Sequence, residues 1–153
     1  MATILILDDR QINREFLVTL LGYAGYHMLE CADGAAALEL TRAKRPDLII
    51  CDMVMPTMDG LEFAKALRGD KSIAHIPIII YTAAFRTGEA NALARSCGIA
   101  EVLTKPTEPE VILSTVSKVL GSAVGAPAPA LVRDSVSRLL KRELANASTG
   151  RFR

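Results

Sequence analysis

Short, uninterrupted runs of Ile, Leu and Val constrain the fold of this chain more than any other feature. Four runs are clear, a fifth is weaker, and each is too short for a helix. They are Thr3–Leu7, Leu48–Cys51, Ile76–Tyr81 and Val102–Thr104, with the weaker run at His27–Cys31. Continuous rather than alternating apolarity indicates strands buried on both faces, as in a parallel sheet that helices cover on both sides.

Helical patterns lie between these runs. Ile12–Leu21 repeats its apolar residues at three and four positions and stops at Gly22 and Gly25, and Ala35–Lys44 stops before Pro46. Three further helices are predicted at Gly60–Leu67, Glu89–Cys97 and Glu108–Leu120. A βα unit repeated five times predicts a doubly wound α/β sandwich of three layers around a five-stranded parallel sheet.

The composition changes after residue 120, which divides the chain. We expect one domain over 1–120, a linker over 121–130 with the sequence GSAVGAPAPA, and an amphipathic helix and frayed tail over 131–153. The helix should span Leu131–Ala145. At about 15 residues it would be marginal alone, so it should pack on the body, on a second copy or on a following domain.

The overall composition excludes several classes of protein. With 50% hydrophobic and 23% charged residues the chain is not a disordered one, and a net charge of +1 gives no electrostatic footprint for nucleic acid. Cys31, Cys51 and Cys97 are too far apart in sequence to indicate a disulfide framework or a zinc site. No secretory signal pattern or long apolar stretch is present, so we expect a cytoplasmic protein without membrane contact.

Polar residues follow four of the predicted strands where each strand ends. Asp8 and Asp9 follow the first strand, Asp52 the third, Thr82 the fourth and Lys105 the fifth. The carboxyl ends of parallel strands lie at one edge of the sheet, where functional groups collect. The sequence therefore predicts one pocket that holds three carboxylates, a hydroxyl and an ammonium group.

Three neighbouring carboxylates repel one another unless a proton, a cationic side chain or a metal ion compensates their charge. Oxygen ligands of this kind select Mg²⁺ or a similar ion such as Mn²⁺, which commonly shares phosphate oxygens. An ammonium can neutralise phosphoryl oxygens, and a hydroxyl can donate a hydrogen bond to one. The predicted set of groups therefore suits metal-assisted phosphoryl transfer.

Four segments together resemble the receiver domains of two-component response regulators. They are ILILDD at the first strand, CDMVMPTMDG around Asp52, IIYTAA at the end of the fourth strand and LTKP at the end of the fifth. Their order and spacing match the family over about residues 3 to 120. The resemblance implies a flavodoxin-like (βα)5 fold. It also implies a phosphorylation-controlled signalling module rather than a turnover enzyme, either alone or at the start of a larger multidomain protein.

The resemblance also implies roles for the residues at the strand ends. Asp52 would accept a phosphoryl group from a sensor histidine kinase or a phosphotransfer protein. Asp9, Asp52 and the backbone carbonyl of Val54 would bind the metal, with Asp8 acting mostly through water. Thr82 and Lys105 would contact the phosphoryl group. A cis peptide bond is implied between Lys105 and Pro106.

The chain departs from the commoner pattern of the family in two respects. Val102 stands where an aromatic residue usually completes the switch, so we expect the signal to leave through the helix at Glu108–Leu120, the linker and Leu131–Ala145. Val54 and Ala84 stand where side chains often orient the attacking water in hydrolysis. Because neither can hydrogen-bond water through its side chain, we expect a long-lived acyl phosphate.

Other interpretations of the same residues are available. Asp8 and Asp9 could simply cap the helix that begins near Gln11. A haloacid-dehalogenase-like hydrolase needs two acids two residues apart on its first strand, which this chain lacks, and no Gly-rich loop supports a nucleotide-binding domain. An unphosphorylated receiver could serve as an interaction scaffold.

The residues after 120 leave the wider architecture open. The linker and helix are typical of the joint between a receiver and a following module, as in a hybrid sensor kinase or a cyclase. A homodimer through the helix at Glu108–Leu120 or through residues 131–145 would fit equally.

Overall fold

The computed structural model describes residues 1–83, 92 and 95–121 of the 153. The strands are β1 (Thr3–Leu7), β2 (His27–Cys31), β3 (Leu48–Cys51), β4 (Ile78–Thr82) and β5 (Glu101–Thr104). The helices are α1 (Gln11–Tyr23), α2 (Gly34–Lys44), α3 (Gly60–Arg68) and α5 (Pro109–Leu120). Most of the helix predicted at Glu89–Cys97, the linker beyond residue 121 and the helix predicted at Leu131–Ala145 lie outside the described residues.

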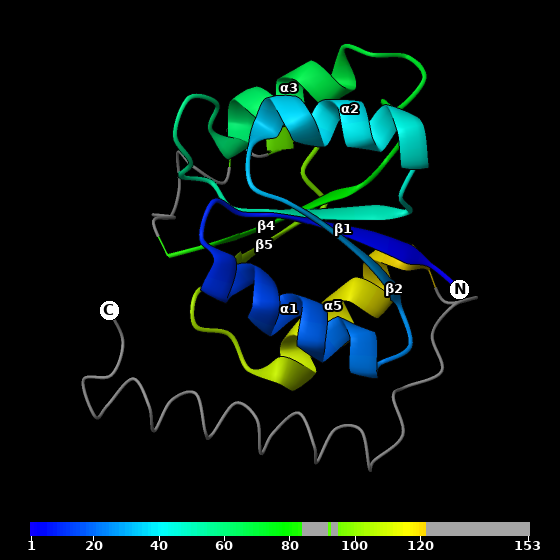
Figure 1. The fold of residues 1–153 in the computed structure, drawn as a ribbon, viewed down its shortest axis with the longest axis vertical. Coiled ribbons are helices and arrows are strands. Elements are labelled where there is room, and N and C mark those ends of the chain that lie inside the picture. The colour runs from blue at the N-terminus through cyan, green and yellow to red at the C-terminus, as the bar shows by residue number, and fades with distance from the viewer. Residues whose placement is uncertain (84–91, 93–94, 122–153) are drawn as a thin grey trace.

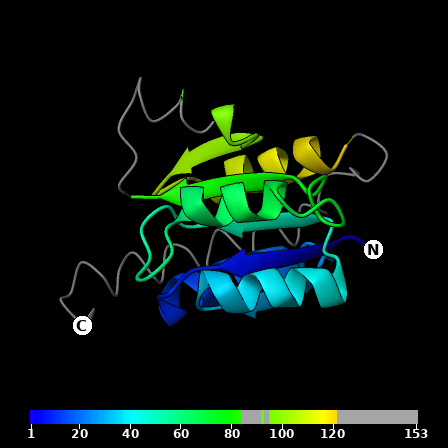
Figure 2. The same ribbon diagram turned by 90° about the horizontal axis from the view of Figure 1, so that it is seen from above.

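The five strands form one sheet in the order β2-β1-β3-β4-β5, and every neighbouring pair is parallel. Figure 1 shows α2 and α3 on one face of this sheet and α1 and α5 on the other, and Figure 2 shows the same layers from above. The predicted doubly wound sheet with helices on both faces is confirmed. Within the part of the chain that the structure describes, no helix has the length and apolarity needed to cross a membrane.

Each face of the sheet has its own hydrophobic core. Leu5 and Leu7 of β1 pack with Phe63 on the side of α2 and α3, whereas Ile4 and Ile6 pack on the side of α1 and α5. This division follows from the alternation of side chains along a strand. All five side chains are fully buried, and burial of such a side chain contributes about 1.5–3 kcal/mol. The continuous apolar runs are thus explained by burial on both faces.

Two element boundaries differ from the prediction by two residues, and several others differ by one. The fourth strand was predicted at Ile76–Tyr81 but begins at Ile78, because the amide of Ile76 bonds to the carbonyl of Ile73 in a turn and Pro77 has no amide hydrogen. The first helix continues through Gly22 and ends at Tyr23. Gly25, with φ of +99°, lies in the turn that follows. Neither difference moves a residue away from the carboxyl edge of the sheet.

Candidate functional site

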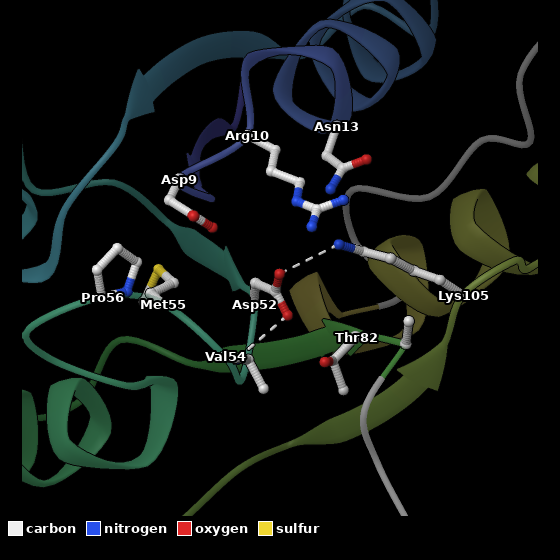
Figure 3. Close-up of a pocket in the computed structure, with 10 residues that line it drawn as sticks. Asp9, Arg10, Asn13, Asp52, Val54, Met55, Pro56, Thr82 and Lys105 are labelled. Atoms are coloured by element: carbon white, nitrogen blue, oxygen red, sulfur yellow. Dashed lines mark hydrogen bonds and ion pairs between the residues drawn. The ribbon is translucent and has the colours of Figure 1, made fainter. Parts of the chain in front are cut away.

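A cleft of about 350 Å³ opens at the carboxyl edge of the sheet. The predicted residues that line it are Asp9, Asp52, Val54, Thr82 and Lys105 (Figure 3). They come from the ends of four strands or from the segments that follow them, with Asp52 and Val54 both after β3. The structure thus brings these predicted residues together at one cleft, whereas Asp8, which was predicted with them, is not among the residues that line it.

Backbone hydrogen bonds extend the strand ladders to these residues. The amide of Asp52 donates to the carbonyl of Leu7 at 3.0 Å, and the amide of Asp8 donates to the carbonyl of Cys31 at 3.2 Å. The amide of Lys105 donates to the carbonyl of Thr82 at 2.9 Å. The positions of the functional side chains are thus fixed by the sheet itself rather than by a separate loop.

Three carboxylates converge at this edge. One oxygen each from Asp8, Asp9 and Asp52 lies within 4.8 Å of the others. The Asp8 side chain is 3% exposed and that of Asp52 11% exposed, while Asp9 is open to solvent. An all-oxygen donor set with partial access to water is the kind that Mg²⁺ or Mn²⁺ takes in proteins. These residues therefore fit a hard divalent cation.

Lys105 compensates part of this negative charge. Its Nζ lies 3.0 Å from Oδ2 of Asp8 and 3.3 Å from Oδ2 of Asp52, and its side chain is 16% exposed. The lysine reaches from the edge strand β5 across β4 and β3 to the end of β1. The peptide bond that follows it, Lys105–Pro106, is cis, as the resemblance implied.

The ammonium group of Lys105 also lies over an aromatic ring. Nζ of Lys105 lies 5.3 Å from the ring centroid of Tyr81, a distance at which the ring attracts the cation. Tyr81 is buried in the core beside α5. Burial raises the pKa of Tyr81, and a hydrogen bond with the backbone of Thr107 opposes the rise. The phenol is therefore neutral near pH 7 and contributes its ring rather than a charge.

The capping interpretation of Asp8 and Asp9 is wrong. The N-cap of α1 is Arg10, and no side chain caps this helix. Oδ1 of Asp8 instead accepts from the amide of Arg10 at 2.9 Å, which leaves Oδ2 to Lys105. The carbonyl of Asp8 accepts from Arg14, so the turn between β1 and α1 is held on both sides of the carboxylate.

The loop after Asp52 is fixed by a close approach of backbone atoms. A Cβ atom on Gly60 would lie 2.4 Å from the Asp52 carbonyl oxygen, so only glycine fits there. The amide of Gly60 donates to the carbonyl of Met53 at 2.8 Å, and Asp59 caps α3 through the amide of Glu62. The start of α3 thus holds the segment that carries Asp52 and Val54.

The remaining predicted residues have different degrees of exposure. Thr82 is 1% exposed, whereas Val54 is 60% exposed at the mouth of the cleft. The Val54 amide lies 3.4 Å from Oδ1 of Asp52. Val102 is half-buried against the core beside α2 and α3, and Ala84 lies outside the described residues.

Cys51 precedes Asp52 but faces the opposite side of the sheet. It is fully buried in the core beside α2 and α3, as predicted. Burial raises the pKa of the Cys51 thiol well above its usual range, and the Asp52 carboxylate raises it further. The thiol is therefore protonated and shielded from solvent.

Two residues of the cleft with polar side chains were not singled out from the sequence. Arg10 and Asn13 line the same pocket from the start of α1, and Figure 3 shows both side chains directed towards it. The available signal was their place in the first helical turn after the paired aspartates, on the segment that borders the carboxyl edge. Their side chains add a cation and an amide to the predicted set.

Comparisons with known proteins agree with this geometry. The family model described as "Response regulator receiver domain" matches residues 4–117. The polar-differentiation response regulator DivK of Brucella anthropi is 32% identical over 121 residues, which cover 79% of this chain and 98% of DivK.

Solved structures with the same fold include the chemotaxis protein CheY4 of Vibrio cholerae, with 35% identity and a TM-score of 0.73 over 78% of this chain and 98% of CheY4. The signal receiver domain of a signal transduction histidine kinase from Syntrophus aciditrophicus is 31% identical. It has a TM-score of 0.73 over 83% of this chain and 95% of that domain.

Proposed function

Because the chain belongs to the response regulator receiver family of two-component signalling, we propose that it takes a phosphoryl group onto Asp52 with the help of Mg²⁺ or Mn²⁺. The observation that carries the proposal is the Lys105 ammonium held between the Asp8 and Asp52 carboxylates at the open edge of the sheet. A cation that is shared by two carboxylates can also contact a phosphoryl group attached to either of them, where it would neutralise part of the added negative charge. Among the residues that the structure describes, only Asp52 has a carboxylate that both lines the cleft and contacts the lysine.

In the proposed reaction an Asp52 carboxylate oxygen forms a bond to phosphorus while the bond between phosphorus and the donor's leaving atom breaks. The electron pair of that bond leaves with the donor, which is the imidazole of a phosphohistidine when a kinase supplies the group. The Lys105 ammonium neutralises charge on the phosphoryl oxygens, and Thr82 donates a hydrogen bond to one of them. The Tyr81 ring keeps the lysine over the cleft during this exchange.

Asp9, Asp52 and the Val54 backbone carbonyl would hold the divalent cation, and Asp8 would act mostly through water. When bound, the ion neutralises the oxygens that are transferred. The carboxylates within 4.8 Å of one another support this assignment through their chemistry. Removal of the metal with a chelator should therefore stop phosphorylation without unfolding the chain.

The proposal includes a comparatively slow loss of the acyl phosphate. The exposed Val54 side chain stands at the mouth of the cleft and cannot orient water. A Val54→Asn variant should hydrolyse the acyl phosphate about fivefold faster, because its amide can hydrogen-bond the attacking water. The rate is measured by intact mass after removal of the donor, with Val111→Asn, an exposed valine on α5, as the control. An unaltered rate in the Val54 variant would exclude this explanation.

The wider setting is proposed on the same basis. The partner would be a cytoplasmic sensor histidine kinase or a phosphotransfer protein, and the chain would act as a switch rather than as a turnover enzyme. Since Val102 replaces the usual aromatic residue, we place the output on α5 and the segment after residue 120, with a homodimer through α5 or residues 131–145 as one form of it. A linker of a different length should then alter partner regulation.

The direct test is intact mass after incubation with Mg²⁺ and a small acyl-phosphate donor. Wild type should gain about 80 Da, the mass of one phosphoryl group, and Asp52→Asn should gain nothing. Asp47→Asn makes the same chemical change at the opposite edge of the sheet, where Asp47 accepts from the amide of Thr3, and should still be phosphorylated. If neither the small donor nor a kinase modifies wild type, the chain acts as an unphosphorylated scaffold and the proposal is wrong.

A further inference from the structure

Arg10 brings a second cationic side chain to the cleft. It follows Asp9 directly, and its backbone amide is held by the carboxylate of Asp8 at 2.9 Å. Figure 3 shows its side chain directed into the pocket that Asp52 and Lys105 also line. The backbone of Arg10 is thus fixed at the edge of the cleft, while its guanidinium extends over it.

Among the described residues, the guanidinium of Arg10 has no hydrogen-bond or ion-pair partner, whereas that of a neighbouring arginine does. Arg14, one helical turn further along α1, donates to Oε1 of Glu30 at 3.0 Å and to the carbonyl of Asp8 at 2.7 Å. Arg10 makes no side-chain hydrogen bond or ion pair with any other residue that the structure describes. Of these two arginines, the one that lines the cleft is therefore available to an incoming group.

Charge balance indicates what that group is. The carboxylates of Asp8, Asp9 and Asp52 carry three negative charges, which a divalent ion and Lys105 together neutralise. Transfer of a phosphoryl group to Asp52 replaces a singly charged carboxylate by a doubly charged acyl phosphate. The positive charge of Arg10 then restores neutrality. When no phosphoryl group is present, the same charge repels the metal ion.

We propose that Arg10 is a phosphoryl-binding residue of this site. Its positive charge stabilises the phosphoryl group once it is transferred, and it weakens the binding of the divalent ion before the transfer. Its planar guanidinium can donate two parallel hydrogen bonds to two phosphoryl oxygens, which a lysine cannot do. Arg10 gives up no proton and forms no covalent bond, because Asp52 makes the bond to phosphorus. This inference rests on the proposed phosphorylation of Asp52.

The proposal predicts effects of opposite sign on two ligands. In Arg10→Gln, Mg²⁺ alone should bind about threefold more tightly, because a like charge is removed from its surroundings. Phosphorylation by acetyl phosphate at saturating Mg²⁺ should be about fivefold slower, because the phosphoryl oxygens lose a charged donor. A general disturbance of the fold would weaken both, so the opposite signs identify a direct electrostatic role.

The experiment compares wild type, Arg10→Gln, Arg10→Lys and Lys71→Gln. Lys71 is an exposed cation in the segment that leads to β4, at the other edge of the sheet, so its replacement matches the charge change at a distance. Mg²⁺ affinity is measured by calorimetry without a donor, and phosphorylation by the time course of intact mass. Arg10→Lys should keep the wild-type metal affinity and recover part of the phosphorylation rate, and Lys71→Gln should match wild type in both.

The outcomes separate this inference from the proposed function. If wild type itself is never phosphorylated, the proposed function fails. If wild type is phosphorylated but Arg10→Gln has unchanged kinetics, or binds Mg²⁺ no more tightly, the role of Arg10 is overturned while the function of Asp52 stands.

Discussion

The two edges of the sheet carry charged side chains that serve opposite purposes. At the amino edge the guanidinium of Arg68 donates to the carbonyls of Ala74, Ile76 and Gly98 at 2.7–2.8 Å, which ties the end of α3 to the segments that precede β4 and β5. At the carboxyl edge three carboxylates lie together, and Lys105 pairs with two of them, Asp8 and Asp52. At the amino edge the charged donor is matched by acceptors, so its charge stabilises the fold. At the carboxyl edge the carboxylates outnumber the cations, so this edge can bind ligands.

Loss of Arg68 should have the largest effect on stability. Arg68→Met removes a charged donor from three carbonyls, so we expect the free energy of unfolding to fall by about 3 kcal/mol. Urea denaturation with and without Mg²⁺ measures it, and Lys65→Met, an exposed residue of the same helix, is the control. Recovery of stability by Mg²⁺ would contradict the distinction between the two edges, because no ligand should replace this guanidinium.

Loss of Lys105 should have the next largest effect, and one that depends on metal. Lys105→Met leaves the buried Asp8 carboxylate facing that of Asp52, so the free energy of unfolding should fall by about 2 kcal/mol in a chelating buffer. Mg²⁺ should restore part of this loss. The same denaturation measurements apply, with Lys118→Met as an exposed control. If Mg²⁺ stabilises this variant no more than wild type, the carboxylates do not form a shared cation site.

Loss of a carboxylate from the crowded edge should stabilise the chain. Asp9→Asn removes one of three neighbouring negative charges, so the free energy of unfolding without metal should rise by about 0.5–1 kcal/mol. The stabilisation that Mg²⁺ gives wild type should disappear in this variant. Thermal unfolding with and without Mg²⁺ tests both statements. Asp47→Asn should instead destabilise, since Asp47 accepts from the amide of Thr3.

The smallest effect should come from Asp70, a surface residue of the amino edge. Hydrogen bonds from Arg42 and Ser72 lower the pKa of Asp70 from 3.8 to about 2. A carboxyl group with a lowered folded-state pKa stabilises the fold above its unfolded pKa and loses that contribution as the pH falls towards the folded value. The difference between wild type and Asp70→Asn in urea should therefore be present at neutral pH and shrink below about pH 4. A difference that stays constant down to about pH 3 would assign it to another cause.

The sequence predicts the sheet and the main site residues because both follow from simple spacing. Continuous apolar runs mark the buried strands, and the residues after them, such as Asp52 and Lys105, must meet at one edge. The start of β4 was misplaced because a turn at Ile73–Ile76 has the same apolar residues as a strand. Hydropathy alone does not distinguish the two.

The sequence could not predict which partner each charged side chain of the site pairs with. Lys105 could have paired with any of three carboxylates, and only the three-dimensional packing selects Asp8 and Asp52. Arg10, the N-cap of α1, and Arg14, in its first turn, are the same residue type, yet one faces the cleft and the other pairs with Glu30. Such selections depend on the twist of the sheet and the angle of α1, which no local pattern encodes.

The contact between Lys105 and Asp8 joins residues that are 97 positions apart. During synthesis on a ribosome, Asp8 and Asp52 emerge long before the lysine that completes their surroundings. A truncated copy that ends before β5 therefore contains Asp8 and Asp52 without the ammonium group that lies between them in the folded chain. The charge arrangement of this edge is thus completed only after β5 has joined the sheet.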